Sequence, residues 1–268
     1  VDIDDTLDSI FSSDMAIGKY VAQRAGIGIN AGRIRGINSK IRGGEVQHTG
    51  VVPFLKKFES TVRCCTQNGI RGGSATVHFP IWHQEIQDIL VLKNNKGTED
   101  NRVRKLDYSI QISQLFYERF IEDKEVSLFS PHDVPGLYES FGTDRFDELY
   151  HRYELDKSIP RKTIGGQELI LDLLKERAET GRIYIMNIDH CNSHSSFQEK
   201  VNMSNLCQEI TLPTDPIQHI DGAGEIALCI LSAINVGKVQ SDRELEDLCD
   251  LSVRALDEII DYQEYPVK

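Results

Sequence analysis

Short stretches rich in β-branched residues alternate along this chain with longer stretches of helical periodicity, and this alternation constrains the fold most. Strands are predicted at 25–30, 73–79, 108–113, 125–129, 182–189 and 224–233. Helices are predicted near 9–24, 48–65, 81–93, 113–123, 143–156 and 166–180. Strands separated by helices are typical of an α/β fold, in which chemistry lies at strand ends and in the loops that follow them.

The clearest helix prediction lies near the C-terminal end of the sequence. Ser241 and Glu244 have the spacing of a capping box, and apolar residues repeat at helical spacing from there to Ile260. Cys249 lies on this apolar stripe, so we expect it to pack in the core. Because no Pro/Ser-rich linker interrupts the sequence, one domain is expected.

The composition excludes several classes of protein. Hydrophobic residues make up 40% and charged residues 27% of the 268 residues, as in soluble globular proteins. No uncharged apolar run reaches the roughly 18 residues of a membrane span, and residues 1–30 have no targeting pattern, so a cytoplasmic protein is expected. The net charge of −12 argues against a broad nucleic-acid-binding surface, and the six irregularly spaced cysteines do not suggest a disulfide framework.

The segment MSNLCQEITLPT at 203–214 is the first candidate site. It places Asn205, Cys207 and Glu209 at alternate positions, so an extended backbone would turn all three side chains to one face. A thiol, a carboxylate base and an amide there would suit nucleophilic or radical chemistry on a small ligand. Spacing alone favours the alternative, a buried cysteine flanked by polar loop residues.

Three further segments are rich in glycine and arginine, at 26–36, 39–45 and 67–75. Glycines allow backbone amides to approach an anion, and arginines add charge-assisted hydrogen bonds, so these segments suit nucleotide phosphates. Flexible surface loops are an equally good interpretation, because neither a Walker sequence nor a dinucleotide-binding fingerprint is present.

Two other cysteine-containing segments are weaker candidates. The cluster DHCNSH at 189–194 lacks the second ligand pair that a zinc site normally recruits, so no metal is expected there. It is predicted to be a loop at a strand end, with hydrogen bonds from Asp189 and His190 inside the loop. Cys229 lies in the apolar run 224–233, where an inert core thiol is the default interpretation.

Most of the chain matches one family. The matching segments are YVAQRAGIGINAGRIRG, IRGGEVQHTGVVPFLK, NGIRGGSATVHFPIWH, VLKNNKGTEDNRVRKLDYSIQI, LFSPHDVPGLY, ERAETGRIYIMNIDHCNSHS, SNLCQEITLPT and GEIALCILSAIN. With these segments the chain resembles the large (alpha) subunit of class I ribonucleotide reductases. The resemblance implies part of a ten-stranded α/β barrel: residues 1–200 as the first half, 201–213 as the finger loop, and 224–268 as the start of the second half.

The same resemblance implies roles for the residues of the finger loop. Cys207 would carry the thiyl radical that removes the ribose 3′ hydrogen, and Glu209 would act as general base at the 3′ hydroxyl. Asn205 would hydrogen-bond the sugar hydroxyls. Cys229 would be one of two thiols that reduce the sugar, and its partner is expected just upstream of Val1.

The resemblance also implies two nucleotide sites and several partners. Ala25, Gly26, Gln67 and Arg71 would contact a ribonucleoside diphosphate substrate. A dNTP or ATP effector would bind at the interface of an alpha homodimer, at Asp5, Arg35, Ile41 and Cys65. The chain itself would hold no cofactor, because a di-metal small (beta) subunit supplies the radical and thioredoxin or glutaredoxin supplies electrons.

Several parts of the family pattern lie outside this sequence, so this chain is not expected to turn over alone. An alternative function is therefore a nucleotide-binding structural piece of a split reductase. Class II and class III reductases share the barrel with other radical sources, and the resemblance to diphosphate reductases disfavours them.

Overall fold

A four-stranded parallel sheet forms the centre of the molecule. The computed structural model describes residues 1–66, 69 and 72–267, and positions 67, 68, 70, 71 and 268 are not described. The strands lie in the order β1-β4-β5-β8, and every neighbouring pair is parallel. They are β1 (Ile27–Asn30), β4 (Ala75–Pro80), β5 (Asp107–Ile112) and β8 (Ile183–Asn187). The α/β prediction is confirmed, because each of these strands overlaps a predicted one.

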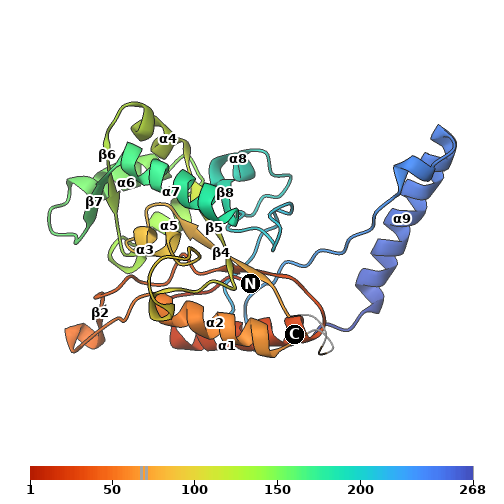
Figure 1. Cartoon of the computed structure of the whole chain (residues 1–268), viewed down its shortest axis with the longest axis horizontal. Helices are drawn as coiled ribbons and strands as arrows, with labels where there is room; N and C mark the ends of the chain where they lie inside the picture. The colour runs from red at the N-terminus through yellow and green to blue at the C-terminus, as the bar shows by residue number, and fades with distance from the viewer. Residues whose placement is uncertain (67–68, 70–71, 268) are drawn as a thin grey trace.

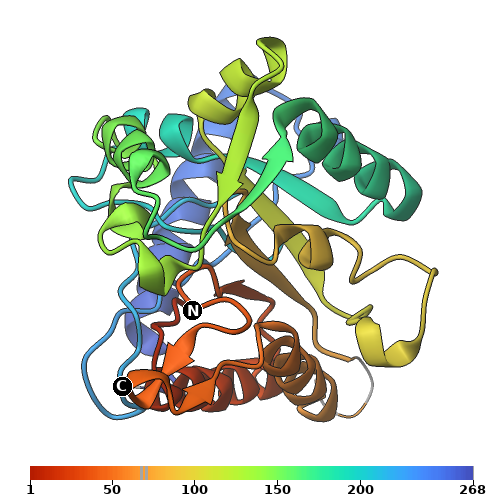
Figure 2. The same cartoon turned by 90° about the vertical axis from the view of Figure 1, so that its left-hand side faces the viewer.

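Helices connect and cover these strands. They are α1 (Leu7–Ala22), α2 (Val52–Cys64), α3 (Ile86–Leu90), α4 (Gln114–Ile121), α5 (Leu137–Ser140), α6 (Phe146–Leu155), α7 (Gly166–Thr180) and α8 (Ile188–Ser193), and a further helix, α9 (Asp242–Tyr262), lies apart from the sheet. Helices α1 and α2 lie side by side in both views (Figures 1 and 2). Helix α1 begins where the Thr6 side chain accepts a hydrogen bond from the Ser9 amide, and α7 ends at Gly181, whose φ of 64° suits glycine.

The two faces of the central sheet differ in character. Val77 of β4 and Ile110 of β5 are fully buried in the apolar core, on the face that the helices cover. Successive side chains of a strand point to opposite faces of a sheet. Thr76, next to Val77, and Ser109 and Gln111, on either side of Ile110, therefore point to the opposite face. These polar side chains are also buried, so they need partners on that face. The loop that supplies the partners carries the candidate site.

Smaller elements surround the sheet. A two-stranded hairpin pairs β2 (Lys40–Ile41) with β3 (Val46–Gln47), and a second antiparallel pair joins β6 (Glu125–Leu128) to β7 (Lys162–Gly165). Single 3-10 turns lie at Arg42–Gly44, Glu99–Asn101, Pro131–Asp133 and Val236–Lys238. The prediction of a strand at 125–129 is confirmed, whereas β7 has no counterpart among the predicted strands.

Two predicted elements differ in the structure. The helix expected over 81–93 is confined to α3, and the flanking residues form turns. The strand expected over 224–233 is absent from this described segment, whose only ladder contact is the bridge between Glu225 and Asp215. A strand requires a neighbour for its backbone groups, and an apolar run alone does not supply one. The prediction at 224–233 is therefore wrong for this chain.

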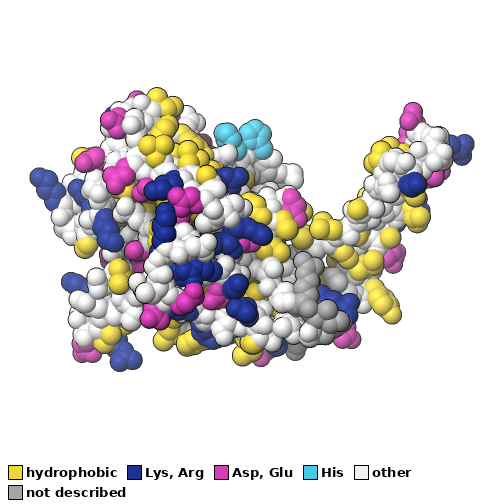
Figure 3. Space-filling view, in the orientation of Figure 1, with side chains coloured by type: hydrophobic (Ala, Val, Ile, Leu, Met, Phe, Trp, Pro, Cys, Tyr) yellow, Lys and Arg dark blue, Asp and Glu magenta, His cyan; other side chains and the backbone are white. Residues whose placement is uncertain are grey.

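Helix α9 stands away from the rest of the molecule (Figure 1). The Ser241 half of its predicted capping box is confirmed, because the Ser241 hydroxyl accepts from the Glu244 amide. The Glu244 carboxylate accepts from the amide of Gln240, one residue before the N-cap, rather than from Ser241. No residue of α9 is buried (Figure 3), and Cys249 is exposed, so the prediction that Cys249 packs in the core is wrong. Within the described residues, neither α9 nor any other helix has the length and apolarity of a membrane span.

Candidate active site

Residues 203–214 form a loop that crosses the polar face of the central sheet. The Thr76 hydroxyl donates to the carbonyl oxygen of Leu206 over 2.6 Å, which attaches the loop to β4. The Gln111 side-chain amide donates to the carbonyl oxygen of Asn202 over 2.5 Å, which attaches the upstream end to β5. The Thr76 hydroxyl and the Gln111 amide thus both donate to backbone carbonyl groups of the loop and its stem, and these two hydrogen bonds fix the loop to the sheet.

Gln208 anchors the tip of this loop. Its side-chain oxygen accepts from the Ser109 hydroxyl over 2.6 Å, and its amide donates to the carbonyl oxygen of Ile185 over 2.7 Å. Its φ of 65° is unusual for a residue other than glycine, and it turns the backbone at this point. Because Gln208 points into the sheet, its neighbours Cys207 and Glu209 project away from it and are exposed.

Asn205 closes the turn. Its side-chain oxygen accepts from the amides of Glu209 over 3.1 Å and Ile210 over 3.2 Å, and from the Ser204 hydroxyl over 3.2 Å. Its Nδ2 group has no hydrogen-bond partner within the described part of the chain. The expected convergence of three side chains is therefore produced by a turn rather than by an extended backbone, and only the donor half of Asn205 faces outward for a ligand.

Two glycines of the segment 26–36 allow the loop to approach β1. A Cβ at Gly28 would lie 2.1 Å from the carbonyl oxygen of Ser204, and one at Gly26 would lie 2.5 Å from the Leu206 side chain. Neither position has room for a larger residue. These glycines thus serve close packing of the loop, whereas the sequence suggested phosphate binding or loop flexibility for this segment.

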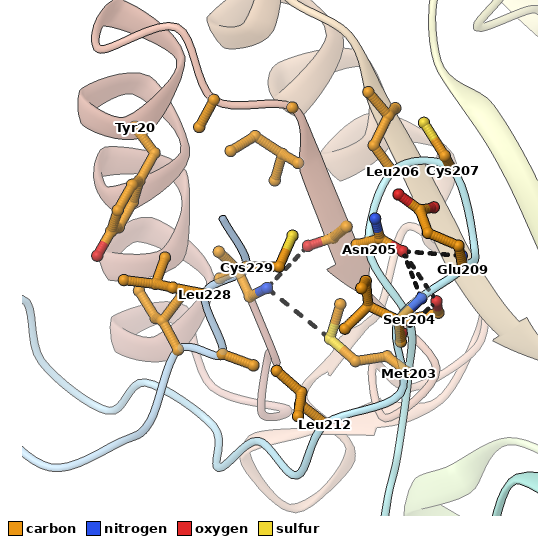
Figure 4. Close-up of a pocket in the computed structure, with 18 of the residues that line it drawn as sticks. Tyr20, Met203, Ser204, Asn205, Leu206, Cys207, Glu209, Leu212, Leu228 and Cys229 are labelled. Atoms are coloured by element: carbon orange, nitrogen blue, oxygen red, sulfur yellow. Dashed lines mark hydrogen bonds between the residues drawn. The ribbon is translucent and has the colours of Figure 1, made fainter. Parts of the chain in front are cut away.

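The loop, the start of β1 and the segment 226–231 line a cavity of about 440 Å³. Its lining includes six of the predicted site residues: Ala25, Gly26, Asn205, Cys207, Glu209 and Cys229. Figure 4 shows Cys207 and Glu209 on the loop and Cys229 on a separate segment across the cavity from them. The volume lies within the range of about 300–1,000 Å³ that is usual for small-molecule sites.

Both thiols of the cavity have a raised pKa. Desolvation, and then the charges of Glu209 and Asp107, raises the pKa of Cys207 above its ordinary value. Desolvation, followed by Glu209 and Cys207, raises the pKa of Cys229. Cys229 is exposed rather than buried, so the default interpretation of it as a core thiol is wrong. A cavity with two neutral thiols and one carboxylate suits hydrogen transfer better than thiolate attack.

A second group of predicted residues lies near the start of α1. The backbone amide of Arg35 donates to one Asp5 carboxylate oxygen over 3.0 Å, and its Nε donates to the other over 2.8 Å. Arg35 also donates to the carbonyl oxygen of Lys40 over 2.9 Å, next to Ile41 on β2. The structure therefore brings Asp5, Arg35 and the Ile41 hairpin together, as an effector site on this surface would require.

Cys65 lies apart from that group. Asp5 precedes α1, whereas Cys65 follows α2 beside Gly18, near the other end of α1. The 16 residues of α1 span about 24 Å, so one copy of the chain does not place Cys65 beside Arg35. Cys64 and Cys65 are both free, with their sulfur atoms 3.8 Å apart. Gln67 and Arg71, predicted to contact the substrate base, lie outside the described residues.

The cluster at 189–194 forms the short helix α8 rather than the predicted loop. Asp189 accepts from the Gln114 amide over 2.6 Å, and the carbonyl oxygen of His190 is within 3.1 Å of His194 Nδ1. From the sequence, hydrogen bonds within 189–194 are expected for both Asp189 and His190. His190 makes one there, whereas the partner of Asp189 lies outside the segment. Among the described residues, no three His, Cys, Asp or Glu side chains are grouped so that they would hold a metal ion.

The anchors Thr76, Ser109, Gln111 and Gln208 are absent from the residues that the sequence singles out. A signal for three of them is present, since polar residues occupy alternate positions within the strand-like runs ATVHF and YSIQI. A polar stripe on a buried strand indicates a polar partner on that face. The periodicity does not indicate which segment supplies it.

Comparison with known proteins agrees with this geometry. A family model described as ribonucleotide reductase, barrel domain, matches residues 1–268. The chain is 57% identical over 273 residues to the ribonucleoside-diphosphate reductase subunit alpha of Haemophilus influenzae, covering 100% of this chain and 36% of that protein. It is 53% identical over 222 residues to ribonucleoside-diphosphate reductase 1 subunit alpha of Escherichia coli, covering 81% and 29%. The subunit alpha of Enterobacteria phage T4 is 46% identical over 275 residues, covering 100% and 36%. The chain thus spans about a third of the length of these relatives.

Proposed function

This chain belongs to the ribonucleotide reductase barrel-domain family, as its sequence resemblance predicts, and we propose that it is the ribose-reducing part of a class I alpha subunit. The proposed reaction converts a ribonucleoside diphosphate into the deoxyribonucleoside diphosphate. The observation that carries the proposal is that Cys207, Glu209 and Cys229 line one cavity, although the two cysteines are 22 positions apart in sequence.

The raised pKa of the two thiols supports radical rather than nucleophilic chemistry. A thiolate is the nucleophilic form of cysteine, and the raised pKa values of Cys207 and Cys229 disfavour it near neutral pH. In the proposed reaction, Cys207 loses a hydrogen atom to the radical source and then removes the 3′ hydrogen of the ribose. The same hydrogen atom returns to the 3′ position at the end of the cycle, which restores the radical on the Cys207 sulfur. The radical source then gives back the hydrogen atom that it took at the start, and this regenerates the thiol.

The remaining groups of the cavity complete the proposed reaction. Glu209 accepts the proton of the 3′ hydroxyl as general base, while Asn205 Nδ2 donates to a sugar hydroxyl. The 2′ hydroxyl leaves as water. Cys229 and a second thiol provide the two electrons and become a disulfide. Val1 lines the same cavity, so a cysteine a short distance upstream of Val1 would lie within reach of Cys229.

The substrate and effector are proposed to bind at two connected sites. Ala25 and Gly26 contact the substrate through their backbone, and Gln67 and Arg71 contact its base. A dNTP or ATP binds at Asp5, Arg35 and Ile41, and Cys65 of the second copy in an alpha homodimer completes the effector site. The loop from 65 to 73 then links effector binding to substrate choice. Asp5 and Cys65 lie near opposite ends of α1 in one chain, so a site that contains both is more easily formed by two chains.

The other partners are proposed from the alpha-subunit relatives. A separate small subunit with two metal ions supplies the radical, and thioredoxin or glutaredoxin reduces the disulfide. Because the chain spans about a third of its relatives, a second candidate function is a nucleotide-binding piece that is inactive alone. In both cases the barrel halves are proposed as 1–200 and 224–268, with the finger loop at 201–213 between them.

The proposal is tested in an alpha subunit of the relatives' full length that contains these residues, combined with a class I small subunit, dithiothreitol and ATP. Reduction of [3H]CDP is the readout. Cys207→Ser is expected to lower the rate more than about 1,000-fold, because the hydroxyl cannot carry the radical. Glu209→Gln is expected to lower it at least about 100-fold.

Cys249→Ser is the matched control, because Cys249 is also exposed but lies on α9 outside the cavity. Its rate is expected to equal that of the parent. A Cys207→Ser variant that reduces CDP at the parental rate would contradict the proposed role of the loop.

A further inference from the structure

Asp2 is a buried carboxylate outside the candidate active site, and none of the roles proposed above involves it. It is 0% exposed. One carboxylate oxygen accepts from the Asn30 side-chain amide over 2.7 Å, and Arg33 Nε lies 3.6 Å from the same oxygen. Burial of a carboxylate is unfavourable unless donors surround it, so a buried Asp with several donors marks a point where the fold is tightly specified.

The second oxygen of Asp2 reaches both ends of the loop that carries Cys207. It accepts from the Asn202 side-chain amide over 3.4 Å and from the Thr214 hydroxyl over 3.3 Å. Asn202 Nδ2 also donates to the carbonyl oxygen of Thr214 over 3.3 Å. Asn202 and Thr214 are 12 residues apart and flank the loop, so this single carboxylate joins its upstream and downstream stems.

The backbone of the same residue adds to this junction. The carbonyl oxygen of Asp2 accepts from the Ile217 amide over 3.3 Å, and Asp2 forms a parallel bridge with Asn30 at the end of β1. The N-terminal segment, β1 and the two stems therefore meet at Asp2. The tip of the loop has its own anchor at Gln208, but the stems decide where the whole loop sits above the sheet.

We propose that Asp2 is a positioning residue for the reaction at Cys207, because it holds Asn202 and Thr214 together and thereby fixes the base of the loop. This inference rests on the proposed function. A displacement of reacting groups by about 1 Å lowers enzymatic rates on the order of 100-fold, so loosened stems should affect catalysis before they affect folding.

The test replaces Asp2 in the full-length alpha subunit described above. Asp2→Asn keeps the side-chain shape but places an NH2 group against the donors of Asn30, Asn202 or Thr214. We expect kcat for CDP reduction to fall about 10- to 100-fold at a temperature well below the melting temperature, with KM changed less than about twofold. Thr214→Val removes one stem's hydrogen bond while keeping the other contacts of Asp2, and a smaller loss in kcat of about 3- to 10-fold is expected.

Glu85→Gln is the matched control. Glu85 is also a buried carboxylate, 3% exposed, and it accepts from the backbone amides of Ile37 and Val51, away from the loop. Its replacement is expected to lower the melting temperature and to leave kcat within about twofold of the parent. A loss of kcat in Glu85→Gln equal to that in Asp2→Asn would show a general effect of lost stability and overturn the proposal.

A second readout does not need turnover. The rate of alkylation of Cys207, followed by peptide mass spectrometry as a function of pH, reports the surroundings of this thiol. The alkylation rate of Cys207 rises with pH as its thiol loses the proton. Asp2→Asn and Thr214→Val are expected to shift the midpoint of this rise to lower pH, because a displaced loop relaxes the desolvation that raises the pKa of Cys207. Glu85→Gln should leave the midpoint unchanged.

The outcomes separate the two proposals. An inactive parent, or an active Cys207→Ser variant, would contradict the proposed function, and the alkylation midpoint would still decide the role of Asp2. Parental kcat together with a parental midpoint in Asp2→Asn would overturn the positioning role alone. If Asp2→Asn does not fold, Thr214→Val decides by the same two measurements.

Discussion

At the residue scale, His78 shows how the polar face of the sheet depends on neutral groups. It is fully buried under the loop, with both ring nitrogens lacking hydrogen-bond partners among the described residues. Burial lowers the pKa of His78 well below its ordinary value of 6.5. The folded protein therefore excludes the proton that the unfolded chain accepts.

This lowered pKa predicts a loss of stability in mild acid. As the pH falls through 6.5, the unfolded chain binds a proton at His78 first, so the free energy of unfolding decreases. The loss from this residue alone should reach about 2 kcal/mol at pH 5. The free energy of unfolding of the His78→Leu variant is measured by urea denaturation at pH 7.5 and at pH 5. Its decrease between these two pH values should be about 2 kcal/mol smaller than the decrease in the parent. The exposed His151→Leu serves as control and should show the parental drop.

The residues of the site were predictable to different degrees. Cys207, Glu209 and Cys229 follow from the resemblance, and the cavity contains all three. The local pattern around Asn205 predicts a shared face but not a turn, because alternation assumes an extended backbone and the φ of Gln208 changes it. Asp2 carries no local signal, since its partners lie about 30 to 210 residues away in sequence.

At the element scale, the contact between the loop and β1 depends on the absence of a side chain at Gly28. Gly28→Ala would place a methyl group 2.1 Å from the carbonyl oxygen of Ser204 and 3.0 Å from Asn205 Cα. Because both neighbours are backbone atoms, the loop must move. We expect a loss of about 1–3 kcal/mol in the free energy of unfolding and at least a tenfold loss of CDP reduction.

Gly237→Ala is the matched control for this change. A methyl group there would lie no closer than 3.4 Å to the side chain of Asn235. Urea denaturation and the CDP assay should both give values close to the parent. Parental stability and activity in Gly28→Ala would show that the loop tolerates displacement. Such a result would contradict the claim that the contact between the loop and β1 requires glycine at position 28.

The elements of the sheet were predictable because their own residues determine them. Buried strands such as β4 and β5 combine β-branched and aromatic residues with clear boundaries, and α1 has a capping residue at Thr6. The segment 224–233 has the same composition but pairs only through Glu225 in the described structure. Its conformation depends on a neighbour elsewhere, which no local pattern specifies.

At the scale of the whole molecule, α9 marks the limit of prediction from periodicity. The helix is predicted correctly, but its apolar stripe is not covered, since Ile259 is 44% exposed and Ile260 is 45% exposed. Periodicity identifies the face that tends to be covered and says nothing of what covers it. The body that carries the cavity is well packed, and α9 extends from it without burying a residue (Figures 1 and 3).

The cavity is lined by segments that lie far apart in the sequence, and the proposal that it is the site of ribose reduction rests on this arrangement. Ala25 and Gly26 precede β1, Cys207 lies on the loop, and Cys229 follows it. The proposed reaction needs all three segments at once, because radical transfer, binding and reduction occur at one ribose. A direct test should therefore detect chemistry at the ribose and at Cys229 in the same sample.

The most direct measurement is a single turnover without external reductant, in the full-length alpha subunit with its small subunit, ATP and excess CDP. We expect about one dCDP per alpha chain, together with loss of the alkylatable thiol at Cys229, since two thiols supply the two electrons. Cys249 should remain fully alkylatable. Formation of dCDP while Cys229 stays a free thiol would contradict the account.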